Sequence, residues 1–386
     1  MKGIKLVAVL LFFSVTLFAQ IRLDVPKYLR LDIPEKYKTV LMIGIDSFLV
    51  DIETGDFDDR ILAKESSTLL KSTYKGFLTY YLKSDKKNKV KLSKQLTNFY
   101  HLEKGKYAIE VSYFQHRSDT VRLRYSLRFV AHLDDTQLVF ALPLAYETGI
   151  WQQFKVGNTS YYFRGNLNKD RATAFDKKNT QIAKKFGLEP ASLAFYMCRN
   201  YQEVLRLLGI EYTVYENGSV NLGYGVVDNT IFSVRNNEDF SHDIFHFYSA
   251  KRHQRKDRNW IAEEGIAYLW GNAYYADEAG EMITMDTLVS VLKQYLKKEY
   301  RKSIYELFKE GDSVYPQFDA RVSIRSVISA LIVKRIEQIY GQKGIEQLIK
   351  CGDGKRVENY LKAIDELLGI TKENFEERLL TLIETY

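Results

Sequence analysis

The sequence predicts an α+β protein with a mainly β N-terminal domain and a C-terminal α+β domain that ends in helices. Three observations carry this prediction. Residues 120–132 alternate between apolar and polar side chains, helical and strand patterns alternate after Trp151, and the pattern from Met285 onward is almost entirely helical. A period of two residues indicates a half-buried strand, and a period near 3.6 indicates a helix. Two domains are expected for 386 residues, because single cores stop growing near ~250–300 residues.

The first twenty residues have the layout of a secretory signal. Lys2 and Lys5 precede an apolar stretch over residues 6–19, which is too short to span a bilayer as a helix. Ala19 precedes Gln20, so cleavage is expected beside Gln20, and an uncleaved anchor is the alternative. No later segment reaches the apolar length of a membrane span. We therefore expect an exported protein, periplasmic or extracellular, with no integral membrane segment after cleavage.

Charge and cysteine content narrow the possible partners. The net charge of +7 falls to +5 once the two lysines of the signal are removed, and basic residues are scattered among acidic ones. The basic stretch over residues 83–91 contains no aromatic residue and reads as a solvated loop. Nucleic acid is therefore not an expected partner. Two cysteines, Cys198 and Cys351, exclude a cysteine-based metal site, and the sequence does not decide whether they form a disulfide.

The N-terminal domain is expected over residues 21–150, with the order of elements set by periodicity and turn residues. The apolar run over residues 40–50 predicts a buried strand pair or a strand–turn element, and residues 61–81 predict a helix. Strands are expected over residues 107–113, 120–132 and 138–142.

The C-terminal domain is expected over residues 165–386. Its helices end at glycines such as Gly187, Gly209 and Gly271, as is typical of helix C-termini. Helices are predicted over residues 176–186, 200–208, 240–252 and 260–270, and strands over residues 192–198, 211–216 and 220–234. The helices from Met285 onward complete the domain.

Two histidines and a glutamate form the strongest chemical pattern in the chain. His242 and His246 are four residues apart within a predicted helix, so both imidazoles lie on one face and can reach one metal ion. The next predicted helix carries two acidic residues, Glu263 and Glu264, and either could complete a site with the two histidines. Two histidines and one glutamate leave a fourth position of a zinc ion open, which is the arrangement of catalytic zinc sites. A histidine pair of this spacing also occurs on helices that bind no metal.

At these residues the chain resembles the gluzincin-type zinc metallopeptidases, the peptidase MA-like group. Such domains carry HExxH on one helix and a Glu-Gly-hydrophobic-Ala string on the next, and residues 264–267 match the second string. The resemblance implies a thermolysin-like domain, with zinc held by His242, His246 and Glu264 rather than Glu263. It covers residues 170–386, whereas residues 21–150 resemble no family that we can name.

The resemblance also implies where a substrate binds. Residues Gly223, Tyr224, Gly225 and Val226 resemble the start of the edge strand along which these enzymes bind an extended peptide by β-augmentation. The expected partner is accordingly a peptide or a protein. The helices after residue 330 resemble the closing bundle of the family.

The chain departs from the family pattern at two catalytic positions. Asp243 stands where the family has the general-base glutamate, and its shorter side chain places the carboxylate farther from a reacting water. The tyrosine that steadies the oxyanion in the family is also missing, because alignment on Tyr340 and Gly341 puts Arg325 or Ser326 at about that position. Arg325 is the candidate oxyanion donor, and Tyr268 and Tyr315 are possible substitutes.

Three functional interpretations remain open from the sequence. In the first, an exported zinc metallopeptidase hydrolyses peptide bonds with zinc-activated water, and Asp243 takes the proton. In the second, a catalytically inactive relative uses the same cleft to bind peptides or proteins in the cell envelope. In the third, the protein is a structural envelope protein without metal.

Overall fold

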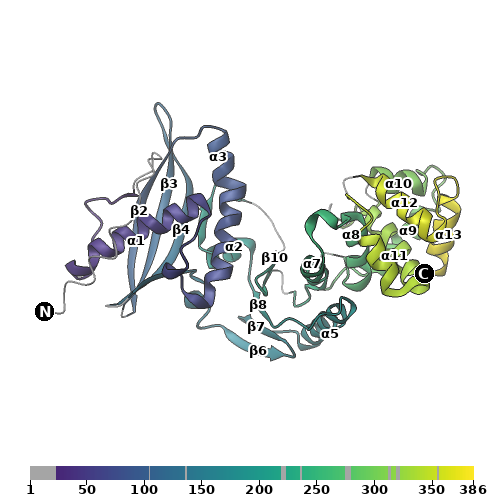
Figure 1. Ribbon diagram of the computed structural model, residues 1–386, viewed down its shortest axis with the longest axis horizontal. Helices are drawn as coiled ribbons and strands as arrows, with labels where there is room; N and C mark the ends of the chain where they lie inside the picture. Colours follow the sequence, from purple (N-terminus) through teal and green to yellow (C-terminus); the bar gives the residue numbers. More distant parts are fainter. Residues whose placement is uncertain are drawn as a thin grey trace. The chain divides into compact units, whose positions relative to one another are not determined.

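The computed structural model describes residues 23–103, 105–134, 137–218, 223–234, 237–273, 280–311, 314–318, 322–353 and 356–386. The fold is α+β, as predicted, with β-sheets in the N-terminal half and a mainly helical C-terminal region (Figure 1). The chain forms two compact units, Met1–Glu147 with Leu205–Gly218, and Thr148–Val204 with Ser219–Tyr386. Among the described helices, none combines the length and the apolar character needed to cross a membrane.

The first unit contains a six-stranded sheet. Strands β2 to β5 form an antiparallel meander, β1 pairs in parallel with β2, and β9 pairs with β4 on a separate branch. The strand bounds are β1 Leu23–Asp24, β2 Leu92–Glu103, β3 Lys106–His116, β4 Val121–Leu133, β5 Leu138–Ala141 and β9 Ile210–Thr213. The pairing of β9 with β4 joins residues far apart in sequence, and the sequence analysis did not predict it.

The prediction of a strand pair over residues 40–50 is wrong, because these residues lie in helix α1 (Glu35–Thr54). The buried side chains of α1 recur with helical spacing, and Phe48 stacks on Phe140 of β5 with ring centroids 4.5 Å apart. The first unit therefore has a helical layer on its sheet (Figure 1). Its other helical segments are η1 Asp59–Ile61, η2 Lys64–Ser66, α2 Ser67–Phe77, η3 Leu78–Leu82, α3 Lys83–Lys87 and α4 Leu144–Glu147.

The predicted solvated loop over residues 83–91 is also partly wrong, because its first five residues form α3. Asp85 on this helix is buried and accepts hydrogen bonds from the first unit's sheet. The N-terminal end of this stretch is therefore held to the sheet by the hydrogen bonds of Asp85.

The second unit contains a five-stranded sheet in the order β10-β11-β8-β7-β6. The central pairs β11–β8 and β8–β7 are parallel, and the outer strands β10 and β6 are antiparallel to their neighbours. The strand bounds are β6 Gln152–Val156, β7 Thr159–Phe163, β8 Leu193–Met197, β10 Gly223–Val227 and β11 Thr230–Ser233. The predicted strand over residues 220–234 is a hairpin, because Asp228 and Asn229 both adopt positive φ and turn the chain.

The core of the second unit lies between this sheet and the helices. Tyr161, Phe195 and Ile231 of three neighbouring strands belong to one continuous buried cluster with side chains of the helices. The helix bounds are α5 Lys169–Lys185, α6 Tyr201–Leu207, α7 Ser241–Arg252, η4 Arg255–Asp257, α8 Trp260–Trp270, α9 Met285–Tyr295, α10 Ile304–Glu310, α11 Ile324–Ile349, α12 Val357–Leu368 and α13 Phe375–Thr385. Helices α7 and α8 pack together and place the candidate site.

Candidate metal centre

The structure brings His242, His246 and Glu264 together, as the sequence predicts. The two histidine Nε2 atoms are 3.2 Å apart, Glu264 Oε1 lies 3.3 Å from Nε2 of His246, and Glu264 Oε2 lies 3.6 Å from Nε2 of His242. Zinc ligands at 2.0–2.2 Å in a tetrahedron are separated by about 3.3–3.6 Å. The three donor atoms therefore have the spacing of one face of a zinc tetrahedron, and the group could hold a metal ion.

The ring orientation of His242 fits metal binding through Nε2. Its Nδ1 lies 3.2 Å from the carbonyl oxygen of Asn272, just after the end of α8. Because a carbonyl only accepts hydrogen bonds, Nδ1 carries the hydrogen in this contact, which leaves the lone pair on Nε2. A ligating histidine that is held through its other ring nitrogen is the usual arrangement in metal sites.

A lysine on α5 fixes the two site helices relative to each other. Lys178 Nζ donates to the carbonyl oxygen of Gly271 at 2.6 Å, and it lies 3.1 Å from Asp239 and 3.3 Å from Ser241. The cation thus contacts the C-terminal end of α8 and the residues that begin α7. A cation is favourable at a helix C-terminus, where carbonyl groups lack partners. Sequence reasoning missed Lys178, since nothing in its local pattern indicates this position.

Two glycines allow the close packing that the site needs. A Cβ atom at Gly271 would lie 2.8 Å from the backbone nitrogen of His242, so only glycine lets α8 end against α7. A Cβ atom at Gly265 would lie 2.2 Å from Oγ of Ser329 on α11. The glycine next to Glu264 therefore has a packing role, and it sets how closely α8 and α11 approach.

The neighbouring carboxylate, Glu263, has a different role from Glu264. It is buried, accepts a hydrogen bond from the hydroxyl of Ser249 on α7, and lies 3.2 Å from Arg258. These contacts engage the carboxylate of Glu263 with Ser249 and Arg258. The expectation that Glu264 rather than Glu263 joins the two histidines agrees with the observed grouping.

Burial and mutual contact shift the pKa values of the three residues. Burial and the neighbouring His246 lower the pKa of His242 to about 4. Burial also acts to lower the pKa of His246, but the hydrogen bond and charge of Glu264 raise it overall. Burial acts against ionisation of Glu264, yet the two imidazoles hold its pKa below the ordinary value. At neutral pH the group therefore offers an ionised carboxylate and a neutral imidazole, both suitable metal ligands.

Asp243 lies beside His242 in the first turn of α7. Burial raises the pKa of Asp243 to about 7, and the charge of Glu264 adds to this while His246 opposes it. The side chain is half-buried. Its role as general base stays a prediction.

The predicted substrate-edge residues Gly223, Tyr224, Gly225 and Val226 lie in β10. This strand ends the five-stranded sheet within the described part of the chain, and it contacts α7. An edge strand has backbone groups available for pairing with another chain. Its role in binding substrate stays a prediction.

Among the described residues, Arg325 contacts the C-terminal end of α10 and Trp260 at the start of α8. Its Nε donates to the carbonyl oxygen of Phe308 at 2.7 Å, a second bond goes to Lys309, and the guanidinium lies over the ring of Trp260. These contacts hold it against the C-terminal end of α10. Its predicted role as an oxyanion donor has no support from these contacts.

Tyr268 is the tyrosine that lies beside the candidate centre. Its ring is 5.7 Å from the ring of His242, and its hydroxyl accepts a hydrogen bond from the backbone nitrogen of Ser323. Tyr315 instead donates to the carbonyl oxygen of Leu288. The spacing of four residues between Glu264 and Tyr268 is the sequence signal that favours Tyr268 over Tyr315.

Both cysteines are free thiols. Burial raises the pKa of Cys198, and it raises that of Cys351 to about 11. Thiols in this state are poor nucleophiles and poor metal ligands. The chemistry of the second unit therefore depends on histidine and carboxylate groups.

Comparison with known proteins adds no family assignment. No protein-family model matches the chain, and no curated protein matches it. The α+β fold and the geometry of His242, His246 and Glu264 are therefore the features of the chain that point to a function.

Proposed function

We propose that this protein binds one zinc ion through His242, His246 and Glu264 and hydrolyses peptide bonds at that centre. The observation that carries the proposal is the set of three donor separations, 3.2, 3.3 and 3.6 Å, which fits one face of a tetrahedron. Three protein ligands leave one position for water or substrate. Structural zinc sites instead fill all four positions with protein ligands.

Different residues of the chain would have different roles in hydrolysis. Zinc, when bound, supplies Lewis-acid chemistry and lowers the pKa of water. Asp243, one residue from His242 on α7, would accept the proton released in the attack on the peptide carbonyl. Strand β10, which contacts α7, would hold an extended peptide through backbone hydrogen bonds. Asn272 would keep His242 oriented throughout.

One observation favours a second function, the binding of peptides or proteins without hydrolysis. Asp243 is one methylene shorter than the glutamate of the peptidases that the chain resembles. A general base that does not reach the reacting water can lose much of its contribution to the reaction rate, which is typically about 10²–10⁴-fold. Such a protein would bind zinc and peptide through the same groups but would turn over slowly or not at all.

Metal analysis tests the first part of the proposal. Purified protein loaded with zinc and then passed through a desalting column is expected to retain about one zinc ion per chain. His246→Ala is expected to retain none. His101→Ala is the matched control, because His101 is an exposed histidine of β2 in the first unit. Equal zinc content in wild type and His246→Ala, or no zinc in either, overturns the proposed centre.

A peptide-library assay separates hydrolysis from binding. We expect the zinc-loaded wild type to cleave peptides, Asp243→Glu to retain cleavage, and Asp243→Asn to lose it. An inert wild type together with an active Asp243→Glu would instead assign the protein to the binding function. Zinc content is measured in parallel, so that loss of activity is not confused with loss of metal.

A further inference from the structure

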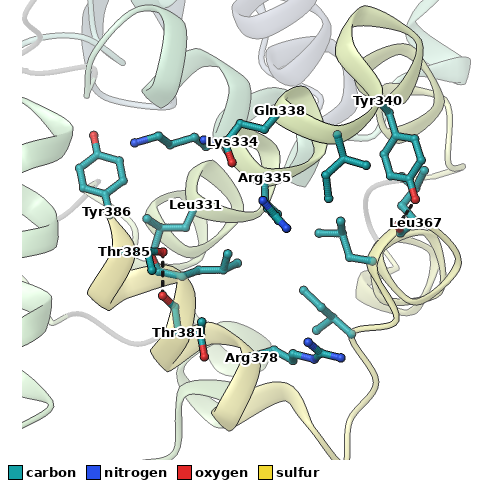
Figure 2. Close-up of a pocket in the computed structure, with 14 residues that line it drawn as sticks. Leu331, Lys334, Arg335, Gln338, Tyr340, Leu367, Arg378, Thr381, Thr385 and Tyr386 are labelled. Atoms are coloured by element: carbon teal, nitrogen blue, oxygen red, sulfur yellow. Dashed lines mark hydrogen bonds between the residues drawn. The ribbon is translucent and has the colours of Figure 1, made fainter.

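A cavity lies in the helical bundle of the second unit, among α11, α12 and α13 (Figure 2). Its volume is about 660 Å³, within the range of about 300–1,000 Å³ that is typical of small-molecule sites. Part of its wall is apolar. The apolar side chains that line it are Leu331, Ile339, Leu367, Leu368, Ile370 and Leu382.

The polar part of the lining is cationic. Lys334, Arg335 and Arg378 line the cavity, and its lining includes no aspartate or glutamate. Lys334 Nζ is already engaged, since it lies 4.0 Å from the ring centroid of Tyr386. Arg335 of α11 points into the hollow, and Arg378 of α13 lies along its lower edge in the view of Figure 2; both side chains are exposed. Two arginines from different helices therefore share one cavity that has no counter-charge from an acidic side chain.

Arg335 and Arg378 are exposed and differ from three less exposed arginines of the second unit, although the exposed Arg255 and Arg356 likewise have no ion-pair partner among the described residues. Arg171, Arg258 and Arg301 each form an ion pair with a glutamate. Within the described part of the chain, neither Arg335 nor Arg378 has an ion-pair or hydrogen-bond partner for its guanidinium group. Guanidinium groups bind carboxylates through paired hydrogen bonds. The two free groups are therefore available to an anion from outside the chain.

The hydroxyl groups of the wall are already used. Tyr340 donates to the carbonyl oxygen of Leu367, Thr381 to that of Glu377, and Thr385 to that of Thr381. Among the described residues of the wall, the amide of Gln338 remains for such contacts, so the wall offers few partners for the several amide groups of a peptide, and an unpaired amide is costly to bury. A ligand with one anionic end and an otherwise apolar body fits these groups better.

We propose that this cavity binds an aliphatic carboxylate, with the head group at Arg335 and Arg378 and the chain against the apolar wall. The charge of the lining selects the anion, and the leucine and isoleucine side chains bury the chain. This site uses none of the candidate zinc ligands. It is therefore independent of the proposed hydrolytic function.

Calorimetric titration of the full-length protein in the presence of EDTA tests the site without any contribution from zinc. The ligand is decanoate, kept below its critical micelle concentration. Decanol tests the need for charge, and acetylated trileucine with a free carboxylate tests the preference for a chain without amides. We expect saturable decanoate binding at one site per chain, and binding at least about tenfold weaker for decanol and for the peptide.

Arginine variants locate the site. Arg335→Gln combined with Arg378→Gln is expected to weaken decanoate binding by about 100-fold, roughly tenfold per lost guanidinium, and to leave decanol binding unchanged. Arg356→Gln is the matched control, because Arg356 is exposed in the same unit and does not line the cavity. Circular dichroism verifies the fold of each variant.

Three results with the ligands and the double variant would overturn the inference, and one result with the control variant would do so as well. The first three are undetectable decanoate binding by the wild type, unchanged decanoate binding by the double variant, and tighter binding of the peptide than of decanoate. An equal loss in Arg356→Gln would also overturn it, because the effect would then be one of net charge alone.

Discussion

The two units share buried ion pairs, such as Arg124–Asp85 in the first and Arg171–Glu238 in the second, but they differ in one buried polar group. In the first unit, the buried Asp85 accepts hydrogen bonds from the guanidinium of Arg124 and from the hydroxyls of Tyr125 and Tyr215. Lys94, also in that unit, is fully buried and lies 3.3 Å from both Asp46 and Glu53. In these networks the charged groups that meet are of opposite sign.

In the second unit, His242, His246 and Glu264 instead direct three potential metal-donor atoms toward one another. The two histidine nitrogens are only 3.2 Å apart, and a single carboxylate accompanies them. An added cation would give all three atoms a common partner. A buried network whose charged groups pair with one another stabilises the fold, whereas a set of converging donor atoms indicates a ligand.

Loss of Asp85 is the largest effect expected from this comparison. Asp85→Ala leaves the guanidinium of Arg124 without its carboxylate partner in a mostly buried position. Breaking a buried ion pair in this way costs about 3–5 kcal/mol of unfolding free energy. Urea denaturation measures the change, and Asp119→Ala, at an exposed position, should stay within about 0.5 kcal/mol of wild type. A loss below about 1 kcal/mol in Asp85→Ala would contradict the structural role of this network.

Zinc binding should stabilise the protein by a smaller amount. A ligand that binds only the folded state at 100 times its dissociation constant adds about 2.7 kcal/mol. Thermal melts with and without zinc are expected to show a higher melting temperature for wild type and for Asp119→Ala. His246→Ala should not respond to zinc. An equal response from His246→Ala would mean that zinc binds elsewhere.

Gly265→Ala tests how tightly the site helix must pack. The added methyl group would lie 2.2 Å from Oγ of Ser329 and 2.6 Å from its Cβ, so α8 has to move away from α11. Overpacking of this kind costs about 1–3 kcal/mol. Because Glu264 is the adjacent residue, zinc affinity should fall as well, which competition with a chromogenic chelator measures.

Ser329→Gly provides the matched control for that substitution. It removes the side chain that the new methyl group would meet, so the double variant should lose less stability than the two single variants added together. Strict additivity, with no coupling between the two positions, would contradict the predicted contact.

The sequence predicts local features of this protein better than distant ones. The alternation over residues 120–132 corresponds to β4, Val121–Leu133, and the spacing of His242 and His246 places both on one face of α7. Such patterns depend only on neighbouring residues. Helix α1 was missed because its apolar residues also fit short buried strands, and its packing on β5 decides between the two.

Features that join distant segments could not be predicted. Lys178 reaches the ends of α7 and α8 from α5, and β9 returns to pair with β4 of the first unit. The cavity with Arg335 and Arg378 exists only because α11 and α13 pack side by side. Each of these depends on tertiary contacts that leave no local pattern in the chain.

The smallest expected effect concerns Asp51, a carboxylate of the first unit without a cationic partner of its own in the described contacts. Burial raises the pKa of Asp51 to about 6, and the charges of Asp58 and Asp56 add to this, while a hydrogen bond from the backbone nitrogen of Asp58 opposes it. The folded state therefore holds the proton more tightly than the unfolded state, whose pKa is near 3.8. The resulting destabilisation is absent below pH 3.8, grows up to about pH 6, and is complete above it.

Asp51→Asn should consequently stabilise the protein at pH 7 and leave it unchanged near pH 3.5. We expect a gain of about 1–2 kcal/mol at pH 7, after allowance for the partial exposure of the side chain. Urea denaturation at both pH values measures the difference between variant and wild type, with Asp119→Asn as the exposed control. A gain of the same size at both pH values would trace the effect to packing instead. In that case the missing cationic partner of Asp51 would not be what destabilises the first unit.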